Sequence, residues 1–482
     1  MAGIGFELKK IIDRDNIFAQ ARVYFMSSLI TVGPMIICIT LFLVMQRLLK
    51  NLGVSYANIQ IFNAVIIYSF LISYISSNGI SMLMSRYISD CIYTKKSGCI
   101  FESFLGVSII CSVISTLVVS ILLINSPLNL IIKSICFMIT IILSLIWLEI
   151  IYLSAIKEYL HIVSFFLIGI SIVILGTILG IKFLGIPPIY SALLFSLAGY
   201  IFIAISFMVL LYKVFGIRDL RLYNCLKFID SIDKYYELLF IGLFLSLGAY
   251  FPNILIWLTP NATLVEETFR IASFYDVPSF YAFLSVIPSV VIFTVKIETA
   301  IYPKYKEFYN FVRESGSINE IRRSKKILID TIILHMTHMI EVQFIASFAC
   351  IVFGFKMLPN MGFASDSLEI FGILTLGAIS YISMSFLILM LLYFDARKDA
   401  LQVSLVLVLF SVITVIIGPE YYGYGFFISS IISVVFAFNR INNFFKIIEY
   451  RTFASQPVFQ VEEKRFFSRI YNFFNKENKK EV

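Results

Sequence analysis

The chain has 482 residues, of which 60% are hydrophobic and 14% are charged, and its mean hydropathy is +0.92. A water-soluble domain cannot carry this composition on its surface, so the sequence predicts a polytopic membrane protein. The net charge of +8 does not indicate nucleic-acid binding, because membrane proteins collect Lys and Arg in cytoplasmic loops for orientation alone. We expect a lipid bilayer as a partner and no nucleic acid.

The first 22 residues are predicted to form a cytoplasmic amphipathic segment. Ile4, Leu8 and Ile11 fall on one helical face and charged residues occupy the rest, a pattern that favours a position along the membrane surface. The apolar run of a signal peptide is missing, and Ala2 stands where myristoylation requires Gly. We expect this segment to remain uncleaved and unlipidated.

Twelve apolar runs then approach the ~20 residues needed to cross a bilayer as a helix. The sequence therefore predicts an all-α polytopic membrane protein with twelve transmembrane helices. They lie at about 23–46, 59–85, 101–124, 130–152, 160–181, 188–212, 237–259, 277–302, 327–355, 368–393, 400–417 and 424–445.

The distribution of basic residues predicts the orientation of these spans. With a cytoplasmic N-terminus, 31 of the 38 Lys and Arg residues fall on the cytoplasmic side, six on the opposite side, and Lys296 within a span. By the positive-inside rule, we expect both termini to be cytoplasmic and the protein to cross its membrane several times. None of the seven cysteines is placed on the outer side, and none has the spacing of a metal site, so we expect neither disulfides nor a metal.

The loops are too short for a catalytic domain. The longest cytoplasmic pieces, about 303–326 and the tail 446–482, fall below the 50 residues or more that a nucleotide-binding domain typically needs. We therefore expect no enzyme activity and no cofactor. The tail places aromatic residues near helical spacing with Lys and Arg between them, which favours membrane contact or docking of a partner.

An internal duplication divides the chain. Residues 86–102 and 304–320 share a cation followed by Tyr, then an aromatic residue, Ser-Gly, Ile and Glu, at a constant offset of 218. Several matches at one offset indicate an internal repeat. We expect two six-helix lobes, 23–236 and 237–445, related in parallel by a pseudo-two-fold axis along the membrane normal, as in transporters.

The same offset aligns Pro34 with Pro252. A proline inside a helix removes a hydrogen bond and kinks it, so each is predicted to free a carbonyl oxygen near mid-membrane. Interrupted helices at matching places in two halves favour a central substrate path. The alternative is that both prolines are merely tolerated, as prolines often are in membrane helices.

The opening MAGIGFEL, followed by the basic amphipathic stretch, resembles the N-terminus of the PelG-type inner-membrane proteins of Pel exopolysaccharide export. The twelve spans in two lobes are similar to the multidrug, oligosaccharidyl-lipid and polysaccharide (MOP) exporter superfamily. This resemblance implies translocation of an N-acetylhexosamine-rich polysaccharide across the cytoplasmic membrane. It also implies a cytoplasmic glycosyltransferase and inner-membrane partners of a Pel-type complex, including a cyclic-di-GMP receptor. No catalytic motif is carried over.

Ionisable groups within spans are costly and usually face a cavity or a partner. Glu341 lies near the middle of the ninth predicted span, and His335 and His338 precede it at intervals of three, within about a 120° sector of the helix. This trio is predicted to couple transport to protons or to hydrogen-bond sugar groups. The alternative is a buried interhelical hydrogen-bond cluster.

Three further polar residues are candidates for the substrate path. Lys296 and Glu298 lie in the eighth predicted span, and the offset of 218 aligns Lys296 with Asn78. We expect Lys296 and Asn78 to line the cytoplasmic half of a cavity. Alternatively, Lys296 snorkels to the membrane surface, because it lies only about 9 Å from the predicted helix end.

Aromatic side chains in the spans provide candidate faces for sugar stacking. Tyr74, Tyr250, Tyr281 and Tyr381 have small or polar neighbours in sequence, but 27 Tyr and 48 Phe make lipid-facing or packing roles common. Trp147 and the nearby acidic residue Glu149 are expected to anchor the fourth span at the membrane interface.

The residues are also compatible with other functions. A lipid-linked oligosaccharide flippase or a cation-coupled drug antiporter of the same superfamily would share this architecture. A scaffold within a polysaccharide synthesis complex would also use the loops and tail. Asp13 and Asp15 fit a short D-x-D pattern of glycosyltransferases, but the chain offers no α/β domain to hold a nucleotide.

Overall fold

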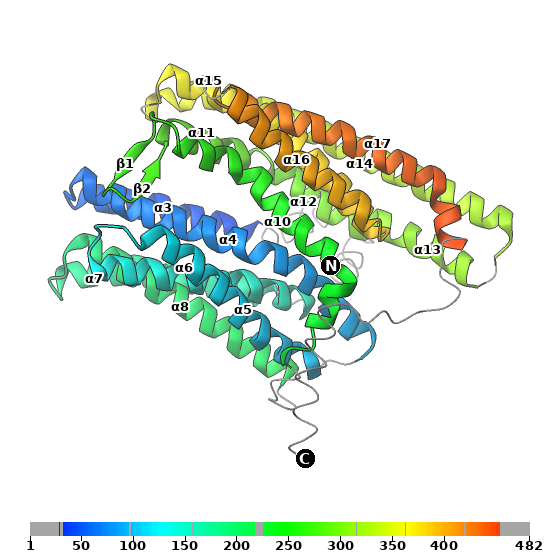
Figure 1. Cartoon of the computed structure of the whole chain (residues 1–482), viewed down its shortest axis with the longest axis horizontal. Coiled ribbons are helices and arrows are strands. Elements are labelled where there is room, and N and C mark those ends of the chain that lie inside the picture. Colours follow the sequence, from blue (N-terminus) through cyan, green and yellow to red (C-terminus); the bar gives the residue numbers. More distant parts are fainter. Residues whose placement is uncertain are drawn as a thin grey trace, which may run out of the picture. The chain divides into compact units, whose positions relative to one another are not determined.

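The computed structural model describes residues 28, 32–95, 98–156, 159–216, 225–314, 316–361, 363–418 and 421–453. Within these ranges it is almost entirely helical and contains twelve helices long and apolar enough to cross a membrane (Figure 1). The number of predicted spans is therefore confirmed. The N-terminal segment 1–22 and the tail from residue 454 onward lie outside the described residues.

The first six candidate spans are single helices. They are α3 (Gly33–Asn51), α4 (Tyr56–Tyr93), α5 (Gly98–Leu123), α6 (Leu130–Ile156), α7 (Tyr159–Lys182) and α8 (Pro188–Phe215).

The second six begin with α10 (Ile229–Trp257) and are followed by a short hairpin and a segmented span. The remaining elements are β1 (Thr263–Val265), β2 (Phe269–Ile271), α11 (Ser273–Leu284), α12 (Ile287–Lys296), the π-helical turn η1 (Ile297–Ile301), α13 (Tyr302–Arg313), α14 (Ile318–Met357), the 3-10 turn η2 (Pro359–Met361), α15 (Ser365–Tyr393), α16 (Arg397–Ile417) and α17 (Tyr424–Phe453).

Several helices are longer than their hydropathy predicts. The 38 residues of α4 extend over about 57 Å, whereas the hydrocarbon core of a bilayer is about 30 Å thick. Helix α14 begins nine residues before the predicted span, where Ser317 and Glu320 form a capping box. Hydropathy detects only the apolar part of a helix, and backbone hydrogen bonding carries the same helix beyond it.

The chain folds into two compact units, and each is described separately. The amino-terminal unit holds Pro34–Tyr250 and Pro260–Ile271. The carboxy-terminal unit holds Phe251–Thr259, the described residues from Ala272 onward and the few described residues before Pro34. Helix α10 therefore contributes to both units. The lobe boundaries predicted from the sequence stay a prediction.

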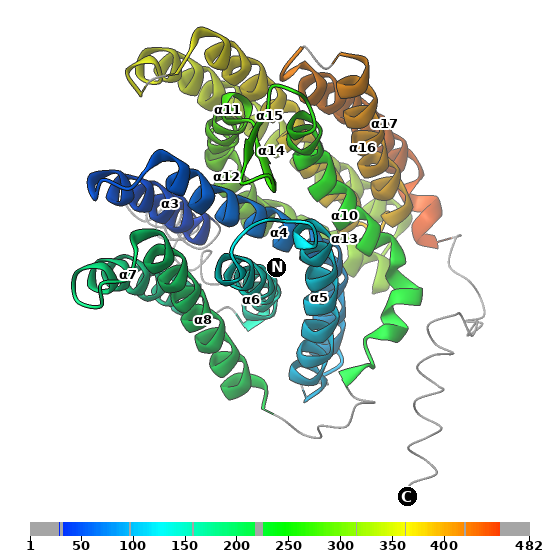
Figure 2. The same cartoon turned by 60° about the vertical axis from the view of Figure 1, so that its left-hand side comes forward.

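In the amino-terminal unit, α6 is the central helix and packs against α4, α5 and α8 (Figure 2). The antiparallel β1–β2 hairpin rests on α4: the Tyr68 hydroxyl donates to the Arg270 carbonyl oxygen over 2.8 Å and accepts from its N–H over 3.1 Å. The rings of Tyr68 and Phe269 lie 4.9 Å apart. The sequence pattern did not predict a strand here.

In the carboxy-terminal unit, α15 packs against α11, α14, α16 and α17. The span from α11 to α13 is broken at Ser285 and Val286, just before Pro288. Gln343 of α14 donates to the Ser285 carbonyl oxygen and to the Ser347 hydroxyl, and accepts from the Ser289 hydroxyl. A buried polar side chain from a neighbouring helix thus pairs with the polar groups at this break.

Candidate functional site

Three aromatic side chains from three helices meet in the amino-terminal unit. Tyr74 of α4 lies between Trp147 of α6 and Tyr250 of α10, with ring centroids 5.8 and 5.7 Å away and nearly perpendicular planes. We call these three residues the aromatic cluster. Tyr250 is 36% exposed, and the other two side chains are half-buried. The cluster therefore combines packed edges with accessible ring surface.

Serine hydroxyl groups of α4, α5 and α6 lie next to the aromatic cluster. The Trp147 indole N–H donates to the Ser73 hydroxyl over 3.1 Å, which fixes the orientation of the ring. A chain of hydroxyl contacts, Ser76 to Ser115 over 2.8 Å and Ser115 to Ser144 over 2.7 Å, joins α4, α5 and α6. These small polar side chains allow the three helices to pack closely while their hydroxyl groups remain paired.

Trp147 and Glu149 both pack against neighbouring helices. Trp147 packs on α4, and Glu149 is only 2% exposed. Within the described ranges, the Glu149 Oε2 atom has no hydrogen-bond partner. The expectation that Glu149 is an interface anchor is wrong, because an anchoring carboxylate must reach water. Hydropathy places a residue along a helix but does not tell which side of the helix it occupies.

Asn78 lies where α4 crosses α10 within the amino-terminal unit. Its amide donates to the Gly242 carbonyl oxygen over 2.8 Å. The two glycines at the crossing, Gly79 and Gly242, allow the two backbones to approach closely. The amide of Asn78 thus joins two helices, and contact between Asn78 and a substrate stays a prediction.

The two aligned prolines occupy different local environments. Pro252 lies inside α10, directly after the boundary between the two units, and the non-helical backbone of α10 is found at Tyr235 instead (φ −132°, ψ 29°). Pro34 lies in the first turn of α3, and residues 29–31 before it are outside the described ranges. The proposed kinks at Pro34 and Pro252 stay predictions.

A carboxylate that was not among the predicted site residues organises the chain around the end of α10. Asp276, in the first turn of α11, accepts hydrogen bonds from the Asn253 amide over 2.9 Å, the Trp257 indole over 2.8 Å and the Ala272 N–H over 3.0 Å. An acidic residue in a first helical turn was the available signal. All three donors belong to the carboxy-terminal unit, so these hydrogen bonds give Asp276 a structural role there.

The predicted trio of α14 lies on the accessible side of that helix. The side chains of Glu341 and His338 are 65% and 53% exposed, and the Glu341 Oε2 atom lies 3.7 Å from the His338 Nδ1 atom. His335 is half-buried. The buried interhelical network of α14 is formed by Gln343 instead, so the alternative of a buried Glu341 cluster is wrong.

Lys296 and Glu298 flank and enter the π-helical turn η1. Lys296 is half-buried at the end of α12, and α12 packs against α14, the helix that carries His335. Glu298 lies within η1 and is 9% exposed. A π-helical turn inside a longer helix is often found at functional sites, and the sequence pattern did not reveal it. The structure thus places Lys296 on a helix next to the one that carries the Glu341 trio, whereas Asn78 belongs to the other unit.

Comparisons with known proteins identify the fold. A search of curated proteins gives no match. The MATE transporter VcmN of Vibrio cholerae shares the fold at 14% identity and a TM-score of 0.62, over 93% of this chain and 99% of that one. A eukaryotic MATE transporter is similar over 94% of this chain and 98% of its own, at 12% identity and a TM-score of 0.56. A MOP superfamily transporter from Pyrococcus furiosus is similar over 89% of this chain and 96% of its own, at 12% identity and a TM-score of 0.54.

These likenesses show that the chain has the two-lobe fold of MATE transporters in the MOP superfamily. A family model for PelG, described as "Putative exopolysaccharide Exporter (EPS-E)", matches residues 1–453. That match extends from the amphipathic opening to the end of α17. The chain therefore belongs to the PelG family of exopolysaccharide exporters and is a multi-pass integral membrane protein with a transporter fold.

Proposed function

We propose that this protein translocates an N-acetylhexosamine-rich, Pel-like exopolysaccharide across the bacterial cytoplasmic membrane. The observation that carries the proposal is the PelG family match over residues 1–453, on a chain with the two-lobe fold of a transporter. Both termini are cytoplasmic in this proposal. A cytoplasmic glycosyltransferase supplies the polymer, and inner-membrane proteins of a Pel-type complex, including a cyclic-di-GMP receptor, are the partners.

The aromatic cluster supports a carbohydrate substrate. A pyranose ring presents C–H groups on its faces and hydroxyl groups around its edge, and an aromatic face with nearby hydroxyl groups complements both. Tyr74, Trp147 and Tyr250 provide such faces within three helices that are long and apolar enough to cross a membrane. We propose that they contact successive sugars, while Lys296, Glu298 and the Glu341 trio contribute polar contacts to the path.

The experiment uses inverted membrane vesicles that carry this protein, its membrane partners and the cognate glycosyltransferase, supplied with labelled UDP-N-acetylgalactosamine. The measurement is the fraction of labelled polymer that becomes protected from added glycosidase inside the vesicles. Protection that depends on this protein supports translocation. Equal exposure of the polymer with and without the protein, at normal synthesis, would overturn it and favour a scaffold or efflux of small molecules.

Site variants refine the same assay. Tyr250→Ala is expected to reduce the protected fraction per molecule of protein. Tyr212→Ala is the matched control, because Tyr212 is also an exposed tyrosine of the amino-terminal unit but lies on α8 outside the cluster. Equal loss in both variants would argue against a specific role for the cluster while leaving translocation itself supported.

A further inference from the structure

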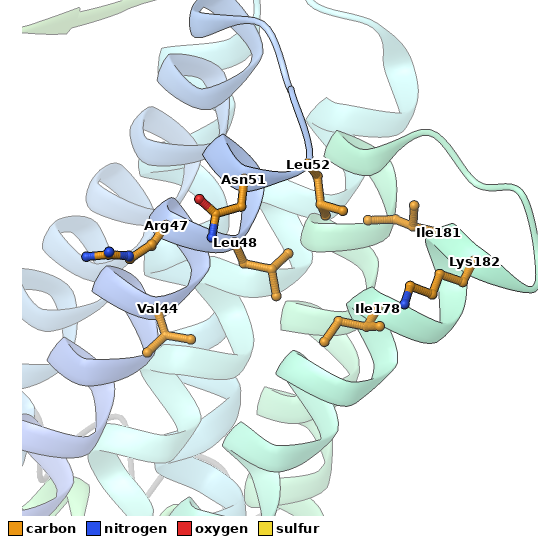
Figure 3. A pocket seen from close by; sticks show the side chains of 8 residues that line it. All are labelled: Val44, Arg47, Leu48, Asn51, Leu52, Ile178, Ile181 and Lys182. Carbon is orange, nitrogen blue, oxygen red and sulfur yellow. The ribbon is translucent and has the colours of Figure 1, made fainter.

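A groove opens on the surface of the amino-terminal unit between the ends of α3 and α7 (Figure 3). Its volume is about 410 Å³, within the range of roughly 300–1,000 Å³ that is typical of small-molecule sites. Five of its eight lining side chains are aliphatic, among them Leu48 of α3 and Ile178 of α7. The floor therefore suits a hydrocarbon chain.

The polar side chains of the groove are Arg47, Asn51 and Lys182. Asn51 and Lys182 are the last residues of α3 and α7, and both line the groove. In Figure 3 the ammonium group of Lys182 points across the groove toward α3, while the Arg47 guanidinium lies on the side of α3 turned away from α7. In the part of the chain that the structure describes, neither cation has an acidic partner.

The position of these cations is unusual for this chain. Only six Lys and Arg residues fall on the predicted non-cytoplasmic side, and two of them, Arg47 and Lys182, line this one groove. Cations at a membrane surface snorkel from an apolar helix face as single side chains. Here they border a preformed apolar groove, whose lining complements a ligand with both a negative group and a hydrocarbon tail.

We propose that the α3–α7 groove binds an anionic phospholipid of the membrane. The Lys182 ammonium, which points into the groove, holds the phosphate, while Asn51 and Arg47 add polar and positive groups on the α3 side. The aliphatic walls contact the first part of an acyl chain. Basic pockets between transmembrane helices recognise lipid headgroups by this combination of charge and apolar surface. The site is separate from the aromatic cluster and does not depend on which substrate is transported.

The test is native mass spectrometry of the full-length protein purified in detergent. Phosphatidylglycerol and phosphatidylcholine of the same acyl chains are titrated, and bound lipid is counted for the wild type and variants. We expect phosphatidylglycerol to bind the wild type in preference, and Lys182→Gln to weaken that binding by about tenfold, the loss expected for one charge-assisted contact. Lys50→Gln is the matched control, because Lys50 is exposed in the last turn of α3 but does not line the groove.

A second measurement locates the lipid. A Trp introduced as Leu48→Trp is expected to be quenched by phosphatidylglycerol brominated on its acyl chain, and less so when Lys182→Gln is added. Equal binding of both lipids, or wild-type binding by Lys182→Gln, would overturn the proposal. Displacement of phosphatidylglycerol by excess inorganic phosphate would also overturn it, because the site would then recognise a free anion rather than a lipid.

Discussion

The side-chain amide of Asn78 donates to the main-chain carbonyl oxygen of Gly242 over 2.8 Å, which joins α4 to α10 inside the amino-terminal unit. A Cβ atom on Gly242 would lie 2.6 Å from the Asn78 carbonyl oxygen, and one on Gly79 would lie 2.8 Å from the Leu239 carbonyl oxygen. Both of these nearest atoms belong to the backbone, so a larger residue cannot be accommodated by a change of rotamer. The crossing of the two helices depends on these glycines.

The first prediction concerns this crossing. Gly242→Ala should lower the free energy of unfolding by about 1–3 kcal/mol, the usual cost of overpacking. The measurement is the thermal unfolding midpoint of the protein purified in detergent. Gly372→Ala on α15 is the control, because the nearest atom to its new Cβ is 3.5 Å away, at ordinary contact distance. Equal midpoints for the two variants would show that α4 and α10 are free to separate.

The second prediction separates ring face from hydroxyl in the aromatic cluster. Tyr74→Phe keeps the face and should retain export, whereas Tyr74→Ala should lower export per molecule by about two- to tenfold, because an aromatic contact is worth about 0.5–1.5 kcal/mol. Export is measured as glycosidase-protected polymer in inverted vesicles, normalised to protein abundance. If Tyr74→Phe and Tyr74→Ala lose export equally, the hydroxyl is the important group and stacking is not.

The third prediction concerns the buried carboxyl group of Glu149. Within the described residues the Oε2 atom of this group has no hydrogen-bond partner, and an apolar side chain of similar size would remove the cost of its desolvation. Glu149→Met should therefore raise the free energy of unfolding by about 1–3 kcal/mol. Gln343→Met is the contrasting variant, because it leaves Ser289 and Ser347 without the partner they have now, and it should lower stability. A destabilised Glu149→Met would mean that this carboxyl group has a favourable partner.

The fourth prediction tests Glu341. Because the Glu341 side chain is 65% exposed, Glu341→Ala should leave the unfolding midpoint unchanged. We propose that Glu341 lies on the substrate path, so the same variant should lower export by about threefold or more. Asp330→Asn is the control on the same helix, and Asp330 is also exposed. The same vesicle assay is used. Unchanged export in Glu341→Ala would remove Glu341 from the path.

The fifth prediction concerns Cys225, which lies between α8 and α10. Burial raises the pKa of the Cys225 thiol, and the nearby Glu102 carboxylate acts in the same direction. Since the thiolate is the reactive form, alkylation by a maleimide should be slower at pH 7 than for a free cysteine derivative and should increase at higher pH. Rates are measured on a variant in which the other six cysteines are Ser. A rate equal to that of the free thiol would show that Cys225 is neither buried nor affected by Glu102.

The sequence by itself determined that this is a polytopic membrane protein and how many helices can span the membrane. Apolar runs of about 20 residues must become helices in a bilayer, because every backbone polar group has to be paired without water. The helix ends were less well predicted: α4 and α14 extend beyond their apolar parts, since backbone hydrogen bonding does not stop at the membrane surface. The opening motif indicated the PelG family, and the family match confirmed it.

The tertiary structure decided which of the candidate residues meet. Tyr74 and Tyr250 were visible in the sequence, but Trp147 joins them only because α6 packs on α4, and an interface role had been expected for it. The trio at Glu341 was found by its spacing, whereas only packing shows that its side of α14 is accessible and that Gln343 occupies the buried side. Periodicity tells on which side of its helix a residue lies. The neighbouring helices decide whether that side faces a protein core, the lipid or a substrate path.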